Sequence, residues 1–277
     1  MKDKVMSLEE AVAQIPDGAT VALGGNTFHR GPSAAVHELV RQGKQELRAV
    51  KTAGAYDIDI LAGAGSINRA AVGYVGFEAL YGLAPNYRRA AEEGRLVVEE
   101  HACYTVITGL RASIQGVPFL PVAGMFGSDV VPARGWKTVY DPYSGEELVA
   151  IPRLAPDWAI IHTELADRDG NALIRGSLFE DLLMANAADR VIVTAEEVAP
   201  SEALRAEGAY ASIPGYLVDA VVHAPRGAWP CSLEDLYPVD EAYLTAYVKA
   251  SKSEATYRDF LEEHVMKPAA LAEGGPS

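Results

Sequence analysis

The sequence predicts an α/β fold in which an open, largely parallel sheet carries helices on both faces. Strand-length runs that are apolar on both faces are typical of buried parallel strands, and they recur at residues 20–23, 47–51, 96–98, 119–122, 158–161, 191–194 and 218–222. Stretches of helical periodicity separate most of them, for example residues 33–41, 87–93, 105–115 and 180–187. Because alternating strands and helices build a sheet covered on both sides, the pattern favours one domain, residues 1–265.

Local signals mark the ends of several elements. Ser7 and Glu10 have the spacing of a capping box, which predicts the start of the first helix. Residues 54–65, GAYDIDILAGAG, are interpreted as a loop. Residues 134–156 are rich in Pro, Gly, Tyr and charge, which predicts a long surface excursion or a small hairpin. Residues 266–277 are predicted to form a flexible C-terminal tail.

Composition and charge narrow the possible partners. The 277 residues include 24 basic and 38 acidic side chains, which gives a net charge of −14. A field of that sign repels nucleic-acid phosphates and anionic lipid, so neither nucleic acid nor a membrane is expected as a partner. The charged N-terminal segment lacks an apolar core of signal-peptide length, and no run reaches the roughly 18 apolar residues of a membrane span. A cytoplasmic location is therefore expected.

Motifs for familiar kinds of site are weak or missing. Cys103, Cys231 and the histidines show no metal-ligand spacing, so no metal site is expected. Residues 63–68, GAGSIN, begin like a dinucleotide fingerprint but lack its third glycine. The sequence contains neither a GxxxxGK(S/T) phosphate loop nor a GxSxG nucleophile elbow. His162 and His223 each end an apolar run, where hydrogen bonding to nearby backbone is the favoured role.

Two polar segments directly follow predicted strands, where open α/β sheets place ligand-binding groups. Residues 24–27, GGNT, can turn sharply and present backbone N–H groups to an oxyanion. The alternative is a tight strand-to-helix turn that binds nothing. Residues 99–101, EEH, end another strand, and the alternative there is a solvated charge pair.

Several long strings together resemble the A subunit of glutaconate CoA-transferase, within the family I CoA-transferases. The resemblance covers about residues 6–260, and the strings stand in the family's order: VALGGNTFHRGPSAAVHELVRQG, VEEHACYTVITGLRASIQGVPFLPV, AIIHTELADRDGNALIRGSLFEDL, VIVTAEEV and IPGYLVDAVVHAPRGAWP. It implies an open α/β fold in a heteromeric enzyme of A and B subunits, often a heterotetramer. It also implies coenzyme A as part of the substrate and no tightly bound cofactor.

The resemblance further implies roles for individual residues. In the family, the glutamate that attacks the thioester lies on the B subunit, while the glycine turn near the reacting carbonyl comes from the A subunit. Gly24, Gly25 and Asn26 then offer oxyanion donors, each typically worth about 2–4 kcal/mol in the barrier. Arg30 can pair a distal substrate carboxylate through its planar fork, the alternative being a surface salt bridge. The implied substrate contacts are Thr27, Arg30, Ser66, Glu100, His101, Tyr104, Phe126, Gly127 and Ser128.

Three positions depart from the family's pattern. The family commonly has an aromatic residue where this chain has Asn26, a basic residue at Gly31 and a histidine at Trp229. These changes leave three reactions open: CoA transfer between a short dicarboxylic acyl group and a carboxylic acid, decarboxylation of a glutaconyl-CoA-type ester such as methylglutaconyl-CoA, and acyl-CoA hydrolysis. An oxyanion hole would serve decarboxylation too, because it stabilises the dienolate that remains after carbon dioxide leaves.

Two hypotheses from other functional classes are weaker. A regulatory protein that senses acyl-CoA would gain support from an appended DNA-binding motif, and the sequence shows none. A self-sufficient hydrolase or dehydrogenase is disfavoured by the missing nucleophile elbow and the incomplete dinucleotide motif.

Overall fold

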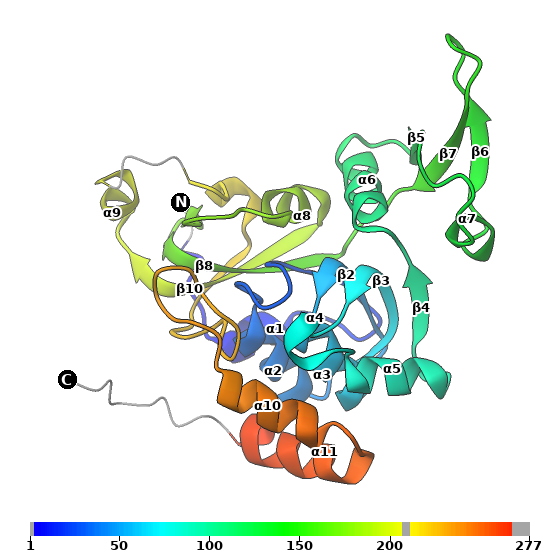
Figure 1. The fold of residues 1–277 in the computed structure, drawn as a ribbon. Coiled ribbons are helices and arrows are strands. Elements are labelled where there is room, and N and C mark those ends of the chain that lie inside the picture. The colour runs from blue at the N-terminus through cyan, green and yellow to red at the C-terminus, as the bar shows by residue number, and fades with distance from the viewer. Residues whose placement is uncertain (1–2, 207–210, 268–277) are drawn as a thin grey trace.

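An eight-stranded sheet runs through the centre of the computed structural model, which describes residues 3–206 and 211–267 (Figure 1). The strand order is β11-β10-β8-β1-β2-β3-β4, and every neighbouring pair along it is parallel. A short strand, β9, pairs antiparallel with β8. The strands are β1 (Thr20–Leu23), β2 (Leu47–Gly54), β3 (Ile67–Val75), β4 (Val97–Glu100), β8 (Trp158–Asp167), β9 (Ala172–Leu173), β10 (Arg190–Ala199) and β11 (Ala220–His223).

Helices cover both faces of this sheet, which confirms the predicted fold class. Successive residues of a strand point to opposite faces. Val21 and Leu23 of β1 therefore share one core cluster with α1, α2, α3, α10 and α11, whereas Ala22 belongs to a second cluster with α6 and α8. The helices are α1 (Leu8–Ala13), α2 (Ser33–Arg41), α3 (Tyr56–Ala64), α4 (Glu78–Tyr81), α5 (Pro85–Glu92), α6 (Cys103–Ile114), α7 (Val130–Ala133), α8 (Asp181–Ala187), α9 (Ser201–Ala206), α10 (Glu241–Ala250) and α11 (Glu254–Leu261), with a 3-10 turn η1 (Gly215–Leu217).

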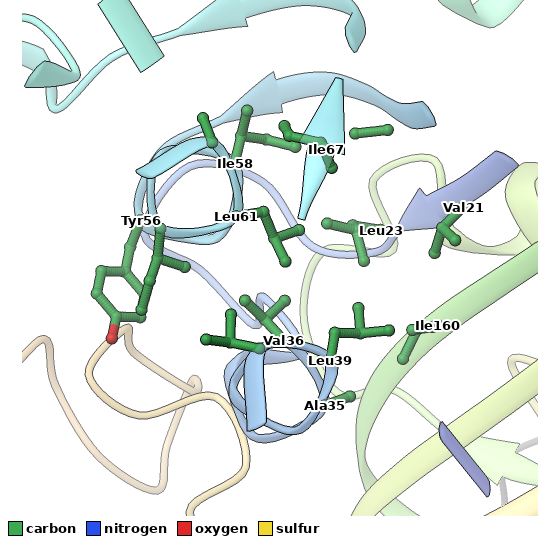
Figure 2. Close-up of a cluster of buried hydrophobic side chains, with 14 of the residues drawn as sticks. Val21, Leu23, Ala35, Val36, Leu39, Tyr56, Ile58, Leu61, Ile67 and Ile160 are labelled. Atoms are coloured by element: carbon green, nitrogen blue, oxygen red, sulfur yellow. The ribbon is translucent and has the colours of Figure 1, made fainter. Parts of the chain in front are cut away.

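The first core cluster lies where β1, α2 and α3 meet (Figure 2). Leu23 of β1, Leu39 of α2 and Leu61 of α3 are all buried there, next to Ile160 of β8. Burial of each such side chain contributes about 1.5–3 kcal/mol relative to exposure. This packing fixes the end of β1, and with it the segment that follows that strand.

The interpretation of residues 54–65 as a loop is wrong, because residues 56–64 form α3. Asp57 accepts the backbone N–H groups of Ala55 and Ile58 at 3.1 and 2.8 Å, which starts the helix. Residues 56–62 are all buried, so the helix lacks the polar face that gives a surface helix its periodic pattern. Residues 63–68 run from this helix into β3, which is the reverse of the strand-to-helix order of a dinucleotide fingerprint.

The expectation that residues 119–122 belong to the parallel sheet is also wrong. They form β5 (Phe119–Val122), which pairs antiparallel with β7 (Glu147–Pro152) in a separate sheet completed by β6 (Lys137–Tyr140). This small sheet and α7 lie apart from the main sheet (Figure 1). Most of β5 is exposed or half-buried, so its apolar run does not mark a central strand. Residues 134–156 include β6 and β7.

The described part of the chain ends shortly after a π-helical turn, η2 (Glu262–Met266). Residues 268–277 of the predicted tail lie outside the described residues. Within residues 3–206 and 211–267, no helix combines the length and the apolar character needed to cross a lipid bilayer.

Candidate active site

The glycine turn after β1 lies at the centre of the carboxyl edge of the sheet. From β1 the strand order runs outward in two directions, through β2, β3 and β4 on one side and through β8, β10 and β11 on the other. Open α/β sheets bind ligands at such a reversal of strand order. The structure therefore places residues 24–30 where a ligand site is expected.

The backbone N–H groups of the turn already have acceptors within the chain. The Gly25 N–H donates to Asp181 Oδ1 at 2.8 Å. The N–H groups of Gly24 and Asn26 each donate to a backbone carbonyl at 2.9 Å. The role of these residues as oxyanion donors stays a prediction, because in this structure the anion at the turn is the chain's own Asp181 carboxylate. Gly25 has a φ of +70°, and a Cβ there would collide with the backbone of His29 and Arg30, so glycine is required at that position.

Arg30 lies buried behind the turn and is only 3% exposed. Its guanidinium pairs with Asp181 at 2.5 Å. It also donates to the backbone carbonyl groups of His162 and Ser177, at 3.2 and 2.8 Å. Arg30 is therefore not the surface salt bridge considered from the sequence, and much of its fork is used within the chain. Its pairing with a substrate carboxylate stays a prediction.

A fully buried ammonium group contacts the glycine turn from the neighbouring strand, β2. Lys51 of β2 donates to the Gly24 carbonyl at 2.5 Å and pairs with Asp57 Oδ2 at 2.7 Å. Lys51 is 0% and Asp57 2% exposed. Breaking such a buried pair leaves an uncompensated charge and is strongly destabilising. The carbonyl that precedes Gly25 is thereby fixed by an ion pair that joins β2 to α3.

A cavity of about 700 Å³ opens beside the turn, within the roughly 300–1,000 Å³ range of small-molecule sites. Glu164 of β8 is 2% exposed, and its Oε1 atom has no hydrogen-bond partner among the described residues. Its Oε2 atom accepts the Arg175 backbone N–H at 3.2 Å. Burial raises the pKa of this carboxyl. The cavity is lined by His29, Arg30, Glu164, Arg175, Ser177, Phe179 and residues 232–238.

One wall of the cavity is held by a side-chain network. His162, which the sequence suggested would bond nearby backbone, instead bonds the side chains of Thr194 and Glu196, both at 2.9 Å. Glu196 also accepts the Tyr237 hydroxyl at 2.5 Å. Burial alone would raise the pKa of Glu196, but the hydrogen bonds from His162 and Tyr237 outweigh it and lower that pKa. His223 is exposed at the end of β11.

The end of β4 is a buried ionic cluster rather than a solvated charge pair. Glu99 is 2% exposed, and its carboxylate receives hydrogen bonds of 2.7–2.9 Å from Arg48, Arg69 and Arg134. Burial by itself would raise the pKa of Glu99, but the hydrogen bonds and charges of Arg48 and Arg69 outweigh it and lower that pKa to about 2. The cluster joins three strands of the main sheet to the segment that leads into the small sheet.

The neighbouring predicted residues do not meet the glycine turn. Glu100 is exposed, whereas His101 is buried, with its ring centroid 5.2 Å from that of Trp136. Burial and the charge of Arg134 lower the pKa of His101 to about 4. Because β4 stands three strands from β1, these residues lie roughly 14 Å from the turn.

The remaining predicted contacts are scattered. The Thr27 N–H donates to the carbonyl of Ala53, at the end of β2, so Thr27 belongs to the turn. Tyr104 is exposed at the start of α6, and residues 126–128 lie in a turn between β5 and α7. Ser66 precedes β3 and lies at the amino edge of the sheet, which is the edge opposite the turn.

The sequence interpretation missed Lys51, Glu164 and Asp181. Lys51 ends the run of residues 47–51, and Glu164 comes shortly after the run of residues 158–161. A charged side chain in a buried strand must either pair with an opposite charge or have a shifted pKa. That signal could have identified both. Asp181 reaches the turn only through the tertiary fold, 156 residues along the chain from Gly25. Across the described residues, no group of three or more His, Cys, Asp or Glu side chains is arranged to hold a metal ion.

The parallel sheet, with the glycine turn and the adjoining cavity at its carboxyl edge, is the arrangement in which α/β enzymes typically bind their substrates. The family model of coenzyme A transferases matches residues 5–224. The chain therefore belongs to the coenzyme A transferase family. It is 38% identical to a longer, uncharacterised protein of Archaeoglobus fulgidus, over 96% of this chain and 60% of that protein.

Two other similar proteins match along most of their own length as well. The chain is 36% identical to the A subunit of glutaconate CoA-transferase from Acidaminococcus fermentans, over 95% of this chain and 88% of that relative. The crystal structure of that organism's enzyme matches with a TM-score of 0.92 at 34% identity, covering 96% of this chain and 90% of that one. The decarboxylase AibA/AibB matches with a TM-score of 0.86 at 35% identity, covering 95% and 98%. The resemblance inferred from the sequence is confirmed.

Removal of the buried ammonium is expected to destabilise the protein. Lys51→Met should lower the free energy of unfolding by about 3–5 kcal/mol, because it leaves the Asp57 carboxylate buried without its cation. Lys51→Met combined with Asp57→Asn should lose less than the sum of the two single variants. Chemical denaturation of all four proteins measures this coupling. Additivity within about 0.5 kcal/mol would contradict the ion pair.

The Glu99 cluster predicts a pH-dependent contribution to stability. Its pKa of about 2 in the folded state lies below the unfolded value near 4.3, so its stabilisation is present above about pH 4.3 and is lost as pH falls toward 2. The stability difference between wild type and Glu99→Gln should therefore narrow between pH 5 and pH 2 in urea titrations. Glu100→Gln, at the exposed neighbour, should change stability by less than about 0.5 kcal/mol. A stability difference between wild type and Glu99→Gln that does not change with pH would contradict the lowered pKa of Glu99.

Proposed function

We propose that this chain is the A subunit of an enzyme that transfers coenzyme A between a short, glutaconate-like dicarboxylic acyl group and a carboxylic acid. The observation that carries the proposal is the likeness to the glutaconate CoA-transferase chain of Acidaminococcus fermentans along nearly the whole sequence, at 36% identity. The cavity lined by His29, Arg30 and Glu164 supports it, since it offers room for an acyl group beside the glycine turn. The partner is a B subunit, and we propose a heterotetramer of two A and two B chains.

The chemistry of transfer fits a site of this kind. An enzyme carboxylate that attacks an acyl-CoA forms a mixed anhydride and releases the CoA thiolate. The thiolate then attacks the enzyme's carbonyl carbon of the anhydride, which forms an enzyme thioester and releases the substrate's acyl group as a free carboxylate. An acceptor acid reverses these steps. Each step exchanges one activated acyl group for another, so neither ATP nor a resident cofactor is required, and coenzyme A enters only as part of the substrate. We assign the attacking glutamate to the B subunit.

This chain's own part is to hold the acyl group and to stabilise the oxyanion. The Gly25 N–H is bound to Asp181, so an oxyanion can use that donor only after the carboxylate withdraws. We expect this rearrangement when the B subunit covers the carboxyl edge of the sheet. Arg30 would then keep its bonds to the His162 and Ser177 carbonyl groups, which hold it beside the cavity.

We place the enzyme in the cytoplasm. Coenzyme A carries phosphate charges that are costly to move through a hydrocarbon layer, so its thioesters stay in the compartment where they are made. The acidic composition of the chain agrees with a dissolved enzyme rather than one held on an anionic membrane surface.

Decarboxylation of a glutaconyl-CoA-type ester is the second candidate. It is favoured by the likeness to the decarboxylase AibA/AibB at 35% identity. Two of the three departures from the family's pattern, Asn26 and Gly31, lie in or next to the turn. The third, Trp229, donates to Asp240 at 3.0 Å and packs on Tyr243, so its change is explained by packing against α10.

Product analysis distinguishes these reactions. The chain is combined with its B subunit, then given glutaconyl-CoA or methylglutaconyl-CoA, with and without acetate, and the products are weighed by mass spectrometry. Transfer predicts acetyl-CoA that appears only when acetate is present, with ping-pong kinetics. The chain without its partner should show no turnover.

Other outcomes would overturn the transferase proposal in distinct ways. Loss of carbon dioxide without acetate would establish decarboxylation instead. Free coenzyme A formed without an acceptor would establish hydrolysis. Full activity of this chain alone would contradict the two-subunit proposal.

A further inference from the structure

We propose that Glu164 determines substrate specificity by donating a hydrogen bond, from its neutral carboxyl group, to the distal carboxylate of a dicarboxylic acyl thioester bound in the cavity. This inference rests on the proposed function for the thioester, but its physical basis is a property of the cavity itself. It names a recognition group that differs from Arg30, whose fork is largely used within the chain.

The first observation is an unsatisfied atom in a buried place. Glu164 is 2% exposed and lines the cavity, and its Oε1 atom has no partner among the described residues. Its Oε2 atom is already held by the Arg175 backbone N–H at 3.2 Å, which fixes the carboxyl group and leaves Oε1 as the functional end. A buried polar atom without a partner costs about 1–3 kcal/mol, so a ligand that satisfies it recovers that cost.

The second observation concerns charge. Arg30 and Arg175 both lie close enough to act electrostatically on Glu164, and both line the same cavity. Two guanidinium groups around one carboxyl suit an added anion better than an added cation. The ion pair with Asp181 holds the Arg30 guanidinium group at this wall of the cavity.

A second carboxylate beside Glu164 requires a proton between the two groups, because two ionised carboxylates in contact repel each other. Burial already raises the pKa of Glu164, which favours the neutral, donating form. The groups that modulate this proton are Arg30 and Arg175, which oppose protonation, together with His29, Glu234 and Asp235 on the other walls of the cavity. The proton on Oε1 then lies between Glu164 and the ligand carboxylate, and Oε2 keeps the Arg175 N–H.

The geometry also explains why the site would reject a monocarboxylic acyl group of the same length. A terminal methyl group in place of the carboxylate would leave Oε1 unsatisfied and would add nothing to the two guanidinium groups. Sites built to hydrogen-bond a polar substrate group discriminate strongly against analogues that lack it.

The test is calorimetric binding to the full chain. The probes are the glutaryl and pentanoyl thioesters of N-acetylcysteamine, which share the thioester end and the five-carbon chain and differ only in the distal carboxylate. At pH 5.5 the glutaryl probe should bind at least tenfold more tightly. Above the pKa of Glu164 in the unliganded protein, this advantage should fall by up to tenfold for each pH unit, because binding then requires uptake of one proton.

Two variants separate this role from mere support of the fold. Glu164→Gln keeps the shape and carries a donor at every pH, so its preference for the glutaryl probe should persist but lose the pH dependence. Glu164→Leu should abolish the preference. Glu197→Gln, at an exposed acid of β10 that does not line the cavity, should behave like wild type. Melting temperatures of the variants show whether each one folds.

Several results would overturn the proposal: equal binding of the two probes, a preference that grows with pH, or a preference that Glu164→Leu retains. A preference that rises with pH would mean that the guanidinium groups of the cavity bind the ionised glutaryl carboxylate without a proton on Glu164. The proposed enzymatic function fails separately, because glutaryl binding with the predicted pH profile would survive even if the two-subunit enzyme transferred no coenzyme A.

Discussion

The buried ammonium of Lys51 is the interaction on which the site depends. It joins three elements at one point, since it rises from β2, bonds the carbonyl at the end of β1 and pairs with the first turn of α3. An unpaired charge at such a depth would be expelled or neutralised. The Lys51 and Asp57 side chains therefore require each other. The Lys51 ammonium group also donates a hydrogen bond to the Gly24 carbonyl. The peptide between Gly24 and Gly25 has its orientation set by this arrangement.

A second ion pair lies on the other side of the same peptide. Arg30 and Asp181 meet at 2.5 Å, and Asp181 also accepts the Gly25 N–H. The turn is thus held at its carbonyl by a cation and at its N–H by an anion. The structure therefore shows the turn binding an anion that belongs to the chain, and in the proposed reaction the same N–H would serve the oxyanion. Catalysis would exchange that anion for the substrate's.

Much of the fold could be predicted from the sequence because parallel strands buried on both faces leave a plain signal. β1, β2, β8 and β10 appear as apolar runs, and the amphipathic face of α2 separates the first two. The same dependence on burial explains why α3, β3 and β5 were not predicted correctly. α3 is buried on nearly every side and so lacks a polar face, β3 has exposed Asn68 and Arg69 near its start, and β5 is apolar but belongs to a small peripheral sheet.

The site was harder to predict than the fold, because its contacts join distant segments. The turn at residues 24–27 could be placed from its glycines alone. Its partner Asp181 and the cavity wall at residues 232–238 come from parts of the chain that only the folded sheet brings together. Glu99 and Glu100 look alike in the sequence, yet one is buried among three arginines and the other is exposed.

The measurement that tests the central claim most directly is the location of the covalent intermediate. The assembled two-subunit enzyme is incubated with glutaconyl-CoA in the absence of an acceptor acid, quenched in acid, and both chains are weighed intact by mass spectrometry. The account predicts that the B subunit gains the mass of one coenzyme A less one water, as a glutamyl thioester, while this chain remains unmodified. An adduct on this chain, or no adduct on either chain while product still forms, would contradict it.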